Sequence, residues 1–417
     1  MSGGIWRERP GADAMKPATD TPAQSIGDGL WMSEGMSNSY CLATDDGRVV
    51  VNTGMGFEGV YHRRKYDAVA AGPTRTVILT QGHFDHVGGV DTFLEPDGTT
   101  DVVAHANWQT WRDDNERLEH FRSSKSAFAF IEPMLAAMQH AREVGAAAAQ
   151  SKPSPTVTFA DRLELVIGGR RMELLAVPGG ETTDSLVIWL PHERIAFTGN
   201  LFGPLFGHVP NLVTMRGDRY RDPLEYMRSI ERILALAPER LITGHFQPIE
   251  GRDRIAEEIT ALREAMQAVH DQVVDGMNAG MDVYALMRTV AVPEHLDVGE
   301  GYGETPWNVR AIYELYTGWF HHRSTTELYA VPPSAVSRDL VTAAGADALV
   351  AAARDRLAAG EPVAALQLTD IVLEVERAHA GAIETAIAAH ESLLAESTNF
   401  WESAWLRRAI TKLGSTS

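Results

Sequence analysis

The chain has 417 residues, a formal net charge of −19 and a hydrophobic content of 44%. The length exceeds that of a usual single core and predicts two domains. The acidic charge argues against nucleic acid and anionic membranes as partners, because both bind basic patches. The chain has a single cysteine, Cys41, and no apolar run long enough to span a bilayer. These two features predict a cytoplasmic protein.

Residues 1–24 are rich in Pro, Ala, Thr and Gly, which predicts a disordered leader. A sheet is then expected, with Asp45-Asp46-Gly47 as a hairpin turn. Its first predicted strands are Gly29 to Met32, Ser39 to Ala43 and Arg48 to Asn52.

The apolar run that begins at Thr76 continues into Thr-Gln-Gly-His-Phe-Asp-His-Val-Gly-Gly, residues 80–89. This order places His83, Asp85 and His86 on a loop at the end of a strand. Imidazoles and a carboxylate on one short turn can bind a divalent ion with little rearrangement of the chain. The alternative, a pair of histidines that only makes local hydrogen bonds, explains less of this pattern.

Further elements follow in order. The spacing of apolar residues over 106–150 predicts helices, and the Ser- and Pro-rich residues 151–155 predict a loop. The strand-like segments are Val102 to His105, Thr156 to Phe159, Leu163 to Ile167, Arg171 to Val177 and Leu241 to Thr243. One of them leads into Pro178-Gly179-Gly180-Glu181, and the last precedes His245.

The C-terminal part is helical in pattern. Arg252 to Met277 predicts one long amphipathic helix, with an apolar stripe of Ile255, Ile259, Leu262, Met266 and Val269. Five shorter helices are predicted at 336–344, 345–359, 362–376, 378–396 and 398–413. Paired helices of this kind resemble a tetratricopeptide-like stack, and a plain intramolecular bundle is the alternative.

The loop motif resembles the H-x-H-x-D-H signature of the metallo-β-lactamase superfamily, with Gln81 in place of the first histidine. Glu181 after the Pro-Gly turn, the run 211–217 and the segment 301–320 resemble the alkyl sulfatase branch. The resemblance implies an α/β fold: an αββα sandwich over 25–251, then an all-α dimerisation domain over 252–417. It also implies a homodimer.

The resemblance further implies two metal positions. The first, expected to hold Zn²⁺ firmly, consists of Asp85, His86 and His245. The second consists of Gln81, His83 and Glu181, and Asn200 lies where the branch has a bridging glutamate. Two neutral amides in place of an imidazole and a carboxylate weaken the second position, so one firm ion is expected. Alternatively, Asn200 only caps a turn.

The same resemblance implies that Arg216 binds the anionic group of a small-molecule substrate, because its planar guanidinium matches two oxygens of a sulfate or carboxylate. Asn211 and Thr214 would add hydrogen bonds. Pairing of Arg216 with a nearby aspartate is the alternative. Trp307 lies where the branch has a histidine that protonates the leaving group. Glu304, Tyr302 or water would have to donate that proton instead, and His208 is another possible donor.

The expected function is therefore that of a metal-dependent hydrolase similar to alkyl sulfatases, in which metal-bound hydroxide cleaves an ester of an anionic molecule. Asp85, His208 and Tyr302 are the predicted catalytic residues. Two alternatives stay open. Two histidines and a carboxylate also form the ligand set of mononuclear iron oxygenases, so Fe is possible. The third possibility is a metal-poor dimeric binding protein.

Overall fold

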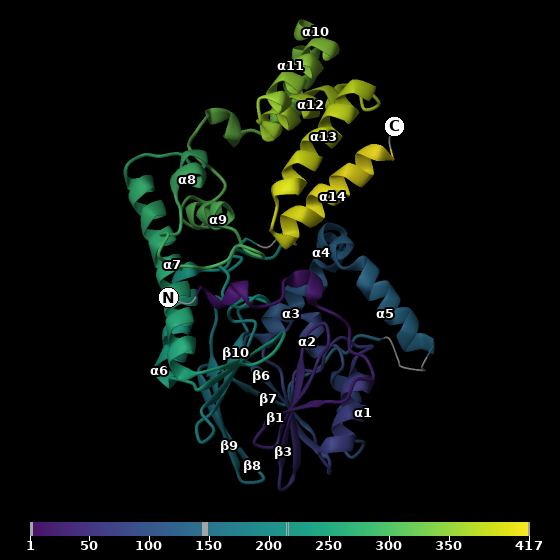
Figure 1. Cartoon of the computed structure of the whole chain (residues 1–417), viewed down its shortest axis with the longest axis vertical. Helices are drawn as coiled ribbons and strands as arrows, with labels where there is room; N and C mark the ends of the chain where they lie inside the picture. Colours follow the sequence, from purple (N-terminus) through teal and green to yellow (C-terminus); the bar gives the residue numbers. More distant parts are fainter. Residues whose placement is uncertain (1–2, 144–148, 214, 216, 416–417) are drawn as a thin grey trace. The chain divides into compact units, whose positions relative to one another are not determined.

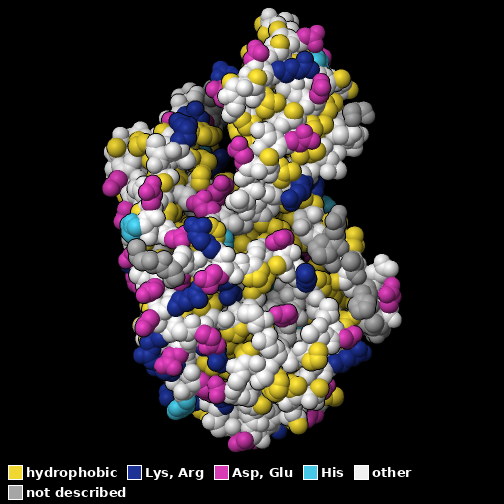
Figure 2. All heavy atoms as spheres, viewed as in Figure 1, with side chains coloured by type: hydrophobic (Ala, Val, Ile, Leu, Met, Phe, Trp, Pro, Cys, Tyr) yellow, Lys and Arg dark blue, Asp and Glu magenta, His cyan; other side chains and the backbone are white. Residues whose placement is uncertain are grey.

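The computed structural model describes residues 3–143, 149–213, 215 and 217–415. The chain divides into two compact units, Met1–Tyr316 and Thr317–Ser417. Within the described residues, no helix is long and apolar enough to cross a membrane. On the face drawn in Figure 2, acidic and basic side chains are interspersed.

The first unit contains two sheets. The seven-stranded sheet has its strands in chain order: β1 (Gln24–Gly27), β2 (Leu30–Ser33), β3 (Ser39–Thr44), β4 (Gly47–Val51), β5 (Thr74–Ile78), β6 (Asp101–His105) and β7 (Val157–Phe159). The six-stranded sheet has the order β13 (Ile249–Glu250), β12 (Arg240–Thr243), β11 (Ile195–Gly199), β10 (Leu186–Leu190), β9 (Arg170–Ala176) and β8 (Arg162–Ile167). The predicted hairpin is present, since Thr44 pairs with Gly47.

The two sheets pack face to face. One buried cluster joins Leu42 and Val49 of the first sheet to Leu174 and Ile188 of the second. Strands β4, β5, β6 and β7 are parallel neighbours, as are β11 and β12. Their carboxyl ends therefore carry the connecting loops, and in sheets of this kind such loops form the binding sites.

Helices cover both outer faces of the sandwich (Figure 1). One face is covered by α1 (Gly59–Val69), α2 (Phe84–Val87) and α3 (Trp108–Arg117), and the other by α6 (Pro223–Leu236) and α7 (Arg252–Asn278). Helix α9 (Thr305–Thr317) adds side chains to the same buried cluster as α6 and α7. The remaining helices of this unit are α4 (Glu119–Ser126), α5 (Ile131–Glu143) and α8 (Val283–Thr289). The αββα sandwich predicted from the sequence is confirmed.

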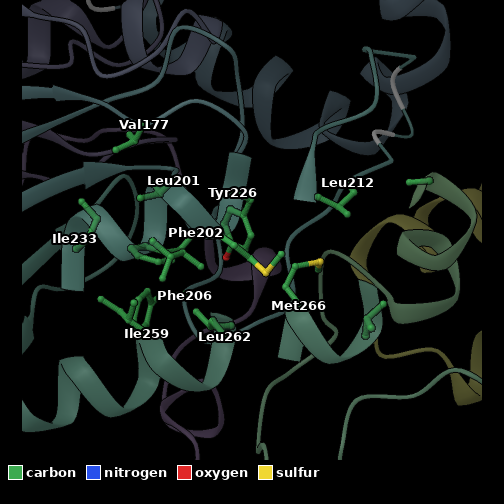
Figure 3. Packing of buried hydrophobic residues seen from close by; sticks show 14 of the residues in the cluster. Val177, Leu201, Phe202, Phe206, Leu212, Tyr226, Ile233, Ile259, Leu262 and Met266 are labelled. Carbon is green, nitrogen blue, oxygen red and sulfur yellow. The ribbon is translucent and has the colours of Figure 1, made fainter. Parts of the chain in front are cut away.

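Helix α7 belongs to the first unit because its apolar stripe is buried in the core of the sandwich. Phe202 and Phe206, from the segment after β11, point toward Ile259 and Leu262 of α7 (Figure 3), and their rings lie 5.3 Å apart. The unit therefore continues to Tyr316. The domain boundary predicted after residue 251 differs from this division, because periodicity along one helix does not show what the helix packs against.

The predicted disordered leader is wrong for residues 3–24. Ile5 is buried in the core, and the backbone N–H of Gly4 donates to Asp297 at 2.7 Å. Arg7 pairs with the same carboxylate at 2.8 Å, and this hydrogen bond is the main reason why the pKa of Asp297 falls to about 2. Composition alone predicted disorder because these partners lie almost three hundred residues away in the chain.

The second unit is all-α. It consists of α10 (Ser337–Ala344), α11 (Ala346–Ala358), α12 (Pro362–Val375), α13 (Ala380–Glu396) and α14 (Phe400–Gly414). Small side chains let neighbouring helices approach closely: Ala353, Ala365 and Ala389 form one buried cluster across α11, α12 and α13. The predicted helices are present within a few residues of their expected ends.

Candidate metal centre

The loop after β5 carries the first candidate ligands. Residue His83 is the N-cap of α2, and Asp85 and His86 lie within this short helix. The backbone is held in place because Thr53 N–H donates to the carbonyl oxygen of His86 at 2.7 Å. His86 is fully buried, whereas the Asp85 side chain is 29% exposed. The spacing thus directs both side chains to one end of the sheet.

His245 reaches the same place from the other sheet, two residues after β12. Its Nε2 lies 3.9 Å from Asp85 Oδ2, and His86 Nε2 lies 3.5 Å from the same oxygen. One ligand atom from each of the three residues fits within 4.8 Å of the others. Gly244 makes this approach possible, because a Cβ there would lie 2.1 Å from Asn200 Oδ1.

These three side chains fit a divalent ion. Burial lowers the pKa of His86 and lowers that of His245 to about 4, so both rings are neutral at pH 7. The Nε2 atoms of His86 and His245 both face Asp85 Oδ2, and the buried His86 Nε2 has no hydrogen-bond partner among the described residues. Two neutral imidazoles and one carboxylate, with one unsatisfied buried nitrogen facing the carboxylate, are a suitable donor set for Zn²⁺ or Fe²⁺.

The second predicted group is held together by hydrogen bonds between protein groups. Gln81 Oε1 accepts the backbone N–H of Asn200 at 3.1 Å, so Gln81 Nε2 lies on the opposite side, 2.7 Å from His83 Nδ1. Glu181 Oε2 lies 3.3 Å from the same nitrogen. An amide nitrogen offers no lone pair to a metal. Gln81 therefore presents a donor where an ion would need an acceptor.

The carboxylate of Glu181 is also paired with a cation. Arg221 donates to Glu181 Oε1 at 2.9 Å, and the two side chains are 6% and 4% exposed. The same guanidinium nitrogen donates to the Asn211 carbonyl at 2.6 Å. The positive charge beside Glu181 is thus already supplied by the protein, which opposes a dication at this position.

The side chain of Asn200 does not cap the turn that follows β11. Its Nδ2 faces His245 Nε2 at 3.1 Å, and its Oδ1 has no hydrogen-bond partner among the described residues. Exchanging the oxygen and nitrogen of this amide would turn the oxygen toward His245. Asn200 therefore lies between the two predicted metal positions and can present either a donor or an acceptor.

A cavity of about 460 Å³ opens beside the cluster, within the range of small-molecule sites. It reaches His83, Asp85, Glu181 and His245, and Tyr302 lies in its wall. The rest of the lining is largely apolar: Met15, Met36, Met55, Phe84, Trp111, Phe130, Ile131, Met134, Leu135 and Met138. Flexible methionines adapt to apolar groups of different shapes.

Other predicted residues lie elsewhere or are not described. His208 does not line this cavity; its Nδ1 accepts the Gly301 N–H at 2.8 Å, and burial lowers its pKa to about 4. Asn211 is buried, and Trp307 is half-buried near the start of α9. Thr214 and Arg216 lie outside the described residues.

Two residues of the site were not recognised as such from the sequence. Arg221 carries no local signal, because its partner Glu181 lies forty positions earlier in the chain. Asn52 directly follows the apolar strand β4, which is a parallel neighbour of β5, and its Nδ2 lies 2.9 Å from His86 Nδ1. A polar residue at the carboxyl end of a buried parallel strand is a signal that could have indicated Asn52.

Comparison with known families agrees with this geometry. Residues 32–245 match the profile of the metallo-beta-lactamase superfamily, and residues 285–413 match the alkyl sulfatase dimerisation profile. The chain is 27% identical over 358 residues to a linear primary-alkylsulfatase of a Pseudomonas species, covering 80% of this chain and 66% of that protein. It is 26% identical over 308 residues to an alkyl/aryl-sulfatase of Saccharomyces cerevisiae, covering 69% and 47%.

A solved structure supports the fold. The stereoselective inverting sec-alkylsulfatase Pisa1 from a Pseudomonas species superposes with a TM-score of 0.79 at 20% identity, covering 93% of this chain and 65% of that one. The chain thus spans about two thirds or less of the length of these relatives. The matches do not favour the iron oxygenase or the metal-poor binding protein. The chain belongs to the metallo-beta-lactamase superfamily, and its second domain is of the alkyl sulfatase dimerisation type.

Proposed function

We propose that this protein is a metal-dependent hydrolase of the alkylsulfatase type, which cleaves an ester between an anionic group and an apolar chain. The observation that carries the proposal is the adjacency of Asp85, His86 and His245 to the apolar cavity. The superfamily implies a bound metal, and we propose zinc. A bound divalent ion supplies Lewis acidity that activates water and polarises the ester.

The protein's own residues would orient the substrate, accept a hydrogen bond from the attacking water and donate a proton to the leaving oxygen. Asp85 lines the cavity, is partly exposed and can accept a hydrogen bond from the attacking water. Tyr302, in the cavity wall, is the proposed donor to the leaving oxygen. His208 is less suited, because its Nδ1 is engaged by Gly301 and its lowered pKa leaves it neutral. The proposal that Arg216 binds the anionic group of the substrate rests on the sequence alone.

The number of ions is proposed to be one. Gln81 directs an amide N–H at His83 Nδ1, and Arg221 already neutralises Glu181. Both contacts disfavour a second dication, whereas Asp85, His86 and His245 fit the first. Elemental analysis of the purified protein tests the number: one zinc per chain is expected, and two would contradict this part of the proposal.

Chain-length dependence tests the substrate class. Burial of each CH₂ in the cavity contributes up to about 0.8 kcal/mol, so kcat/KM for linear alkyl sulfates should rise up to about fourfold per carbon until the cavity is full. Met134→Lys should remove this trend, because Met134 lines the cavity. Leu94→Lys is the matched control, since Leu94 is 41% exposed and does not line this cavity. The proposal would be refuted if the metal-loaded protein released sulfate from none of the esters.

The dimerisation profile suggests a homodimer, and the second unit exposes apolar side chains that suit an interface. Trp319, Tyr329 and Val331 are 69%, 69% and 65% exposed. Sedimentation of the Trp319→Glu/Tyr329→Glu double variant should give a monomer. Val166→Glu is the control, because Val166 is similarly exposed (63%) on a strand of the first unit. A monomeric unmodified protein would contradict the homodimer.

A further inference from the structure

The orientation of Asn52 is determined by its surroundings. Asn52 is 1% exposed, and its Oδ1 accepts the backbone N–H of Thr80 at 3.0 Å. A backbone N–H can only donate, so the amide oxygen must face it. The other end of the amide, Nδ2, is therefore the group that lies 2.9 Å from His86 Nδ1 and 3.0 Å from Thr80 Oγ1. Both N–H groups of the amide are thereby used.

This contact selects one tautomer of His86. If Asn52 donates to Nδ1, then Nδ1 carries the lone pair and the proton of the neutral ring is on Nε2. Nε2 is the atom that faces Asp85 Oδ2 at 3.5 Å. Histidines that bind metals through one nitrogen usually donate the other N–H to a carboxylate, carbonyl or water. The Asn52 amide offers the opposite, a donor.

We propose that Asn52 is a positioning residue that holds His86 as its Nε2–H tautomer and thereby weakens the metal site formed by Asp85, His86 and His245. An ion that binds Nε2 must displace this proton, and the ring then needs an acceptor at Nδ1. The Asn52 amide can supply one only by turning its oxygen away from Thr80, which breaks the 3.0 Å bond to the backbone. The inference rests on the metal position proposed above.

Asn52→Asp is a conservative test. The backbone of Asn52 has φ of 56°, a left-handed conformation that aspartate also tolerates. One carboxylate oxygen can accept from Thr80 N–H and Oγ1, and the other from His86 Nδ1–H. Asn115→Asp is the matched control, because it adds the same charge in the cavity wall, where Asn115 accepts from Arg122 at 2.6 Å.

The first readout needs no metal. In metal-free protein with ¹⁵N-labelled histidine, the ring nitrogen shifts of His86, assigned by their loss in His86→Gln, should report the Nε2–H form. An Nδ1–H form would overturn the proposal even if Asn52→Asp does not fold. Because this measurement involves neither ion nor ester, failure of the proposed hydrolase function would leave it unaffected.

The second readout is Zn²⁺ affinity, measured by competition with a chromophoric chelator. Asn52→Asp should bind Zn²⁺ about 10–100-fold more tightly, the usual effect of a hydrogen-bond partner to a metal-binding histidine, and His86 should change to the Nδ1–H form. Asn115→Asp should change neither property. An equal gain in affinity for both variants would show that charge alone matters and would refute the role of Asn52.

Discussion

The buried pair of Glu181 and Arg221 allows a quantitative prediction. Replacing Arg221 with Met keeps most of the side-chain volume but leaves the 4% exposed carboxylate without its cation and the Asn211 carbonyl without its donor. Removing one partner of a buried ion pair typically costs about 3–5 kcal/mol, because the other charge stays buried and unpaired. We therefore expect the free energy of unfolding of Arg221→Met to fall by about 3–5 kcal/mol.

Urea unfolding of the metal-free protein, followed by tryptophan fluorescence, measures this loss. The double variant Glu181→Gln/Arg221→Met should recover much of it, since no charge is then left buried, and the set of variants gives the coupling between the two side chains. A loss of less than about 1 kcal/mol, the value for an exposed pair, would refute the reasoning. So would a double variant that is no more stable than Arg221→Met.

Three further predictions concern the metal centre and a buried histidine. His245→Ala should lose most bound zinc while the circular dichroism spectrum is unchanged, and full retention of zinc would remove His245 from the site. Gln81→His should raise the zinc content above one per chain; an unchanged content would show that Gln81 is not limiting. Burial, and secondly Lys65, lower the pKa of His62 to about 3. The unfolded chain binds a proton at His62 near pH 6.5, whereas the folded chain binds it only near pH 3. The contribution of neutral His62 to the free energy of unfolding is therefore complete above pH 6.5 and is lost as the pH falls toward 3. Between pH 7 and pH 4, the free energy of unfolding measured by urea titration should fall less in His62→Gln than in the unmodified protein. An equal fall in both proteins would contradict the role given to His62.

Many of the elements could be predicted because their signals are local. The hairpin at Asp45-Asp46, the strand before Gln81 and the apolar stripe of α7 each depend on residues close together in the chain. Strands β10 and β11 and helices α1 and α6 were not placed. In β10 and β11 every residue is buried, so the alternation of polar and apolar residues that marks a half-exposed strand is missing.

For the site, the sequence by itself determined the part that lies within one turn of chain. His83, Asp85 and His86 follow a strand at fixed spacing, so their proximity needs no tertiary information. The residues that match the superfamily motif then indicated His245 and Glu181 as further members. The same reasoning predicted that the amides Gln81 and Asn200 would weaken a second metal position.

Only the tertiary structure decided which atoms of these side chains meet. Whether an amide turns its oxygen or its nitrogen to an imidazole depends on backbone donors from distant segments, such as Thr80 for Asn52 and Asn200 for Gln81. The pairing of Glu181 with Arg221 joins residues forty positions apart. Hydrogen bonds and charges act over a few ångströms, and the folded chain alone sets which groups come within that distance.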